Sequence, residues 1–198
     1  MPLGIIRKFG LTAKTGQEAS YTKGTESRSH VGAGMFRLLA NDGLHAITKF
    51  NAFCLSPFEW LHLPKTYTIG TGLAPGVVAH LSALAHGAWN QITNSQTAGA
   101  FQLAVWEIVS ETDSQTLNIA DGNFKVTYAS DPGAFALAQT WLTNVNSGSF
   151  QTNLSQITIF SADYTQDLLT AQVPLPGAFG SLMLGLFGLG SLRRARRV

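Results

Sequence analysis

AGAFQLAVWEIV, residues 98–109, is the most strongly patterned run in the body of the chain. Apolar residues recur in it at helical spacing and also fill the positions between, so the run predicts a helix buried on nearly all sides. Gln102 is the one amide in this run and lies in line with Trp106, one turn later. A buried amide without hydrogen-bond partners costs on the order of 1–3 kcal/mol. Gln102 must therefore either find such partners or no longer be an amide.

Cys54, the only cysteine of the chain, makes the second possibility concrete. It follows Phe53 within FNAFCLSPFE, residues 50–59, and the pattern Q-x-A-x-W begins at Gln102 in the buried helix. This combination resembles the thioester domains of bacterial surface proteins. In that family a cysteine thiol and a glutamine side chain condense, with loss of ammonia, into an internal thioester. The resemblance implies such a bond between Cys54 and Gln102.

The resemblance extends over residues 34–161 and has two departures from the family pattern. Phe101 stands where the family usually has Thr, and Leu55 stands where an aromatic residue is common. We expect Phe53, Phe101 and Trp106 to keep the acyl group dry and so to slow its hydrolysis. An amine or hydroxyl of a surface or matrix partner would take the acyl group and free the thiolate. That reaction is a single attachment, so the chain is not expected to be an enzyme with turnover.

Composition limits the remaining function classes. The chain has 198 residues, 45% of them hydrophobic and 12% charged, which is typical of one globular domain. The net charge is +2, but four arginines lie in the last six residues, so the body is near neutral and nucleic acid is not an expected partner. A single cysteine excludes an intrachain disulfide and a zinc site built from several cysteines. No cofactor or metal is predicted.

The order of predicted elements favours an α+β fold: a small antiparallel sheet or sandwich with about three inserted helices. We expect residues 1–31, rich in Gly, Ser, Thr and charge, to form a flexible arm, residues 32–170 the globular body, and residues 171–198 a tail with a hydrophobic helix. Ser95 or Thr97 is expected to cap the helix that carries Gln102. Strands are predicted at 35–40, 44–53, 65–71, 124–128 and 155–162, and helices at 73–92, from about 97 to 111, and from 132 to about 145.

The C-terminus carries a second signal. It contains, in order, a short proline motif (Val173, Pro174, Leu175, Pro176), an uncharged apolar run at 177–192, and an arginine cluster (Arg193, Arg194, Arg196, Arg197). This order resembles the PEP-CTERM class of sorting tails in its V-P-L-P variant. The resemblance implies export, anchoring in the inner membrane through residues 177–192, and cleavage by an exosortase-type protease before release to the cell surface or matrix. An ordinary tail anchor is the alternative. A buried core helix fits poorly because five of the sixteen residues at 177–192 are Gly.

Cys54 and Gln102 also have interpretations that involve no thioester. Cys54 can be a small buried hydrophobe and Gln102 a satisfied core amide, which would give a non-covalent structural or polysaccharide-associated envelope protein. A cysteine hydrolase would need a histidine base, for which His62, His80 and His86 are the nearest candidates in sequence, but no local signature surrounds Cys54.

Two further groups of residues have structural interpretations. Glu107 and Glu111, one helical turn apart, are expected to form a solvated helix edge rather than a carboxylate pair. The tryptophans are expected in the core, although an exposed one could stack on a sugar; they are Trp60, Trp89, Trp106 and Trp141.

Overall fold

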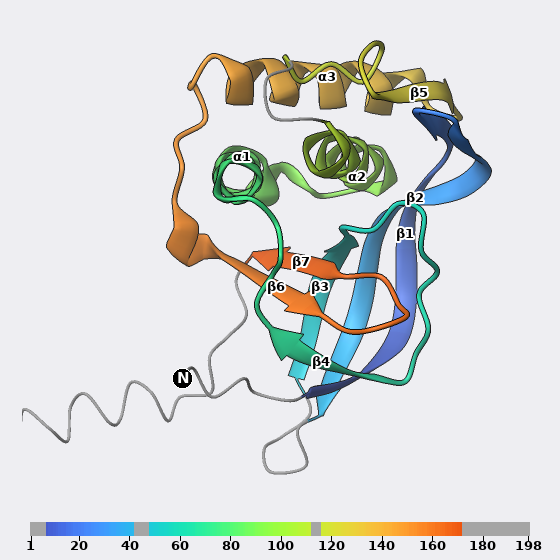
Figure 1. Ribbon diagram of the computed structural model, residues 1–198, viewed down its shortest axis with the longest axis vertical. Coiled ribbons are helices and arrows are strands. Elements are labelled where there is room, and N and C mark those ends of the chain that lie inside the picture. The colour runs from blue at the N-terminus through green and yellow to red at the C-terminus, as the bar shows by residue number, and fades with distance from the viewer. Residues whose placement is uncertain (1–6, 42–47, 112–115, 172–198) are drawn as a thin grey trace, which may run out of the picture.

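The computed structural model describes residues 7–41, 48–111 and 116–171 (Figure 1). It is an α+β fold in which three helices lie over antiparallel strands, which confirms the predicted class. The strands are β1 (Arg7–Lys23), β2 (Glu26–Asn41), β3 (Thr48–Cys54), β4 (Lys65–Ile69), β5 (Phe124–Ala129), β6 (Ile157–Ser161) and β7 (Leu168–Ala171). The helices are α1 (Pro75–Ala88), α2 (Ser95–Ser110) and α3 (Pro132–Asn146), with short 3₁₀ turns at Trp89–Gln91 and Leu154–Gln156.

The strand order is β2-β3-β7-β6-β4-β1-β5, and β1 also pairs with β2. The extra pairing closes six strands into a ring, which leaves β5 outside as a partner of the far end of β1. Every strand pairing is antiparallel. In Figure 1, α1 and α2 lie between the ring of strands and α3.

The prediction of a flexible arm is wrong for residues 7–31, which form β1, the turn that follows it and the start of β2. The two strands pair from Lys8 with Asn41 to Lys23 with Glu26. The sequence of this segment is mostly polar, but a few of its side chains are buried, among them Ala19 and Tyr21, which are 0% and 1% exposed. The segment is ordered by pairing on both sides and not by a hydrophobic run of its own, which is why its composition was misleading.

Gly16 and Gly34 face each other across the β1–β2 pair. A Cβ on Gly34 would lie 2.2 Å from the carbonyl oxygen of Thr15, and one on Gly16 would lie 2.1 Å from that of Ala33. Both glycines are therefore required by the close contact of two backbones, not by their own dihedral angles.

The α2 helix lies across the β1–β2 pair, and its N-cap is neither of the predicted residues but Asn94, one residue before Ser95. Asn94 is the N-cap: its side chain accepts the backbone N–H of Thr97, and the Thr97 hydroxyl accepts the N–H of Asn94. Thr97 thus belongs to the cap as its third helical residue, whereas Ser95 is the first residue of the helix. At Gly99 the helix passes so close to β1 that a Cβ would lie 2.6 Å from Cγ of Gln17.

The last strand of the described chain was missed by the sequence analysis, which ended the sheet at 155–162. β6 covers Ile157–Ser161, and β7 follows with all four of its residues buried. β7 pairs with β6 on one side and with the end of β3 on the other. The expected hydrophobic tail helix lies outside the described residues. Within residues 7–171, apart from the undescribed gaps, no helix has the length and apolar character needed to cross a membrane.

Candidate functional site

The fold brings Cys54 and Gln102 together. Cys54 is the last residue of β3, and Gln102 lies in the second turn of α2, on the side that faces the strand end. The backbone N–H of Cys54 donates to Oε1 of Gln102 at 2.9 Å. In return, Nε2 of Gln102 donates to the carbonyl oxygen of Cys54 at 2.8 Å. Both residues are 1% exposed, so this two-point pairing is inside the core.

The pairing explains how a glutamine is tolerated in an apolar helix. The amide oxygen accepts the N–H of Cys54 and the amide nitrogen donates to the carbonyl oxygen of the same residue. Gln102 thus supplies the two bonds that a neighbouring strand would supply. Cys54 pairs with Leu168 of β7 on the other side, and the next residue, Leu55, donates its N–H to the carbonyl oxygen of Asp167 at 2.9 Å. Gln102 therefore completes the hydrogen bonding at the end of β3.

The Cys54 thiol is strongly shielded from water. Burial raises the pKa of this thiol to about 12, and interactions with the Trp106 side chain and the Ser56 backbone offset part of that increase. The indole Nε1 of Trp106 is buried and has no nitrogen or oxygen acceptor among the described residues. A donor left beside a thiol in this way is suited to stabilise negative charge on the sulfur.

The three expected shielding residues occupy two different sides of the pair. Phe53 and Phe101 are fully buried, with ring centroids 4.6 Å apart, and both pack edge-on against Trp89. Trp106 is on the other side, with its ring centroid 4.9 Å from that of Tyr21. The two phenylalanines therefore form the closed wall, and Trp106 forms the wall next to the opening.

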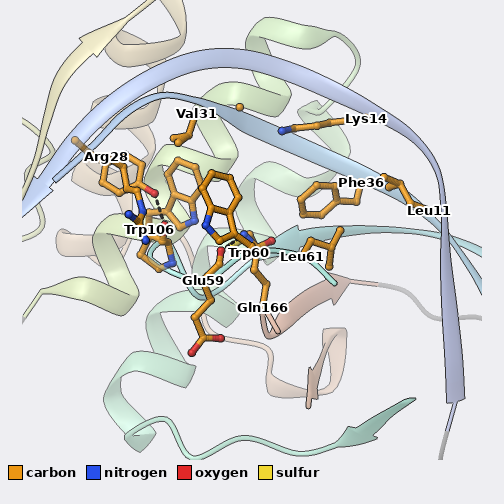
Figure 2. Close-up of a pocket in the computed structure, with 14 residues that line it drawn as sticks. Leu11, Lys14, Arg28, Val31, Phe36, Glu59, Trp60, Leu61, Trp106 and Gln166 are labelled. Carbon is orange, nitrogen blue, oxygen red and sulfur yellow. Dashed lines mark hydrogen bonds between the residues drawn. The ribbon is translucent and has the colours of Figure 1, made fainter. Parts of the chain in front are cut away.

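That opening is a cavity of about 240 Å³ with Cys54 and Trp106 in its lining (Figure 2). The outer wall carries Trp60, which is 61% exposed, together with the charged residues Lys14, Arg28 and Glu59. The thiol is thus buried but separated from solvent by a cavity and not by a solid core. Lys14 and Arg28 were missed by the sequence analysis because they belong to the segment expected to be a flexible arm.

Glu107 and Glu111 are not a solvated edge: they are 0% and 9% exposed. Oε1 of Glu107 accepts the backbone N–H of Asn118 at 2.6 Å, and the Glu111 carboxylate accepts that of Asn123 at 3.0 Å. Both carboxylates thus accept backbone N–H groups from residues 118–123, the segment that leads into β5. Burial, opposed by the Asn118 bond and assisted by the nearby Glu111 charge, raises the pKa of Glu107 to about 8.

The remaining candidates lie elsewhere. His62, His80 and His86 are exposed, and none lines the cavity at Cys54. Trp141 and Trp106 are buried as expected and Trp89 is half-buried, whereas Trp60 is at the surface because it lies in the loop after β3. The sorting-motif residues at 173–176 and 193–197 lie outside the described part of the chain. Among the described residues, no cluster of three or more His, Cys, Asp and Glu is arranged to hold a metal ion.

Comparisons with known proteins yield one solved structure. The thioester domain of the Staphylococcus aureus TIE protein is similar to this chain with a TM-score of 0.47 and 10% sequence identity, over 86% of this chain and 80% of that one. No protein-family model and no curated protein matches the chain.

Proposed function

We propose that this chain is an exported surface or matrix protein that attaches covalently to a partner nucleophile through a Cys54–Gln102 thioester. The observation that carries the proposal is the pair of reciprocal hydrogen bonds, which holds the amide against the residue that bears the thiol. Proximity and fixed orientation are what an intramolecular condensation needs most.

The bond would form by attack of the Cys54 sulfur on Cδ of Gln102. The C–N bond breaks, and Nε2 leaves as ammonia with the thiol proton. Oε1 becomes the thioester oxygen and keeps the Cys54 N–H as its donor, since that bond involves only the oxygen. The same N–H would stabilise negative charge on this oxygen in the tetrahedral intermediates of formation and of later attack.

Trp106 would act on the sulfur side of the same bond. A thiol with a pKa of about 12 makes a poor leaving group, because its anion is not solvated in the core. The buried indole N–H, which has no other acceptor in the described structure, would donate to the thiolate as the C–S bond breaks. The site would then hold one donor for the oxygen and one for the sulfur.

The test is the mass and thiol content of the folded, full-length protein. We expect the measured mass to be lower, by one ammonia, than the mass calculated from the sequence, and we expect Cys54 not to react with iodoacetamide. Methylamine should release the thiol and leave a methylamide on Gln102. Cys54→Ser and Gln102→Glu are the controls, and neither should show the thiol-releasing reaction. A mass equal to the sequence with a freely alkylated thiol in the native protein contradicts the proposal.

The C-terminal tail would deliver this chemistry outside the cell. We assign residues 177–192 to temporary anchoring in the inner membrane and the motif at 173–176 to recognition by an exosortase-type protease. Replacing the two prolines of the motif with alanine should retain the uncleaved chain in the membrane fraction, as should replacing the four arginines at 193–197 with glutamine. Release of an unshortened chain into the medium contradicts this part of the proposal.

A second candidate function follows from the same hydrogen bonds. Both polar atoms of the Gln102 amide have a hydrogen-bond partner, so the pair can also serve as a structural lock in a non-covalent envelope protein. In that protein the Cys54 thiol stays free, and methylamine changes neither the mass nor the thiol content.

A further inference from the structure

The cavity over Cys54 has an unbalanced charge. Lys14 and Arg28 line it, and neither forms an ion pair with a carboxylate of the described residues. Glu59 is the one acid among the described lining residues, and Figure 2 shows its carboxylate directed away from the indole rings of Trp60 and Trp106. The described lining therefore carries a net positive charge.

Arg28 is held in place at this site. Its Nη2 donates to the carbonyl oxygen of Phe58 at 2.7 Å, and its guanidinium lies 5.4 Å from the ring centroid of Phe58 and 5.7 Å from that of Trp60. A guanidinium fixed by one bond and by stacking keeps donors for a carboxylate or phosphate. Lys14 is less constrained, with Nζ 5.8 Å from the ring centroid of Phe36.

The cavity also offers an aromatic surface. Trp106 lines it beside Cys54, and its indole N–H is the donor assigned above to the sulfur. Trp60, at 61% exposure, offers a flat apolar surface at the outer side. Cations in the lining of a cavity and an exposed ring are features of a polar ligand site and not of a core.

The lining also distinguishes between nucleophiles. A hydroxyl needs a general base, and among the described lining residues there is no histidine, while the one carboxylate points away. A neutral amine needs no base. Nearby cations lower the pKa of an incoming ammonium group and so favour its neutral, nucleophilic form. They also repel the protonated form, and an anionic group next to the amine would offset that repulsion.

Resting on the proposed thioester, we infer that this cavity selects a primary amine carried next to an anionic group. The amine nitrogen attacks Cδ of Gln102, a C–N bond forms, and the C–S bond breaks. One amine proton is transferred to the Cys54 sulfur, so the products are an amide and a free thiol. Lys14 and Arg28 bind the anionic group beside the amine.

The experiment compares three small amines with the same two-carbon spacing and different second groups: taurine, ethanolamine and (2-aminoethyl)trimethylammonium. The rate of Cys54 thiol release from the full-length protein at low salt is divided by the concentration of neutral amine. We expect taurine to react fastest and the cationic amine slowest, with a difference on the order of tenfold between them. Lys14→Gln should reduce this difference and Lys14→Glu should abolish or reverse it, whereas Lys49→Gln, at an exposed position outside the cavity, should leave it unchanged.

Equal rates for the three amines, or a faster reaction of the cationic one, would overturn this inference while leaving the thioester in place. Failure of every amine, methylamine included, to release a thiol would instead refute the proposed function and this inference with it. Addition of 0.5 M NaCl, which shortens the electrostatic screening length to roughly 4 Å, should reduce the differences between the rates of the three amines. A purely steric preference would not depend on salt in this way.

Discussion

At the scale of single residues, the Gln102 amide carries the hydrogen bonding at the end of β3. In a Cys54→Ala background, where no thioester can form, Gln102→Ala leaves the N–H and C=O of residue 54 buried without the partners that the amide supplies. We expect a loss of about 2–4 kcal/mol in the free energy of unfolding, measured with urea. Gln91→Ala is the matched control because its amide bonds to a carbonyl at an exposed position. Equal effects of the two substitutions would contradict the assigned role.

Glu107 makes stability depend on pH. Its pKa is raised to about 8 in the folded protein from 4.5, so the folded state keeps a proton that the unfolded chain releases between these values. Stability should therefore be highest below pH 4.5 as far as this group is concerned, and fall as the pH rises to about 8. Each pKa unit corresponds to about 1.4 kcal/mol, so the fall is on the order of a few kcal/mol.

Glu107→Gln tests this dependence by urea unfolding between pH 5 and 8.5. The amide keeps an oxygen for the Asn118 N–H and carries no charge, so the variant should lose most of the downward slope that the wild type shows. Glu26→Gln, which removes an exposed carboxylate at the start of β2, should leave the slope unchanged. A wild-type stability that stays level or rises across this range would refute the assignment.

At the scale of elements, the run 98–109 was predictable from local signals: apolar residues at helical spacing indicate a helix, and apolar residues at the positions between indicate that it is buried. The strand predicted at 44–53 also ends within one residue of β3, whose last residue is Cys54. β1 was not predictable in this way: Gln17 and Thr15 are polar, and the strand exists because β2 and β5 pair with it. The burial of Glu107 likewise depends on a segment eleven residues away, which no local pattern reveals.

The Gly16–Gly34 contact leaves no room for a side chain on either strand. Gly34→Ala would place a Cβ 2.2 Å from the backbone oxygen of Thr15, and backbone has no rotamer that relieves the overlap. We expect a loss of about 3 kcal/mol or more, measured by thermal or urea unfolding. Gly72→Ala is the control, since its Cβ would meet nothing within 4 Å. If both variants unfold alike, the two strands do not approach as closely as described.

At the scale of the whole molecule, the thioester would join the closed ring of strands to the helical layer. It links β3 to α2 across 48 residues of chain, and a cross-link of that length stabilises a fold by about 4 kcal/mol through the entropy of the unfolded state. Loss of the Gln102 donor to the Cys54 carbonyl offsets about 1–3 kcal/mol of this gain. The net effect should remain stabilising.

Opening the thioester with methylamine should therefore lower the melting temperature of the protein. Calorimetry before and after treatment measures the change, and the mass of each sample reports whether Gln102 carries the methylamide. Cys54→Ser, which has no thioester to open, should melt at the same temperature with and without methylamine. An adduct of the right mass with an unchanged melting temperature would mean that the bond adds nothing to the coupling between α2 and β3. In that case the hydrogen bonds of the amide alone would account for the coupling between α2 and β3, because they hold these two elements together without any covalent link.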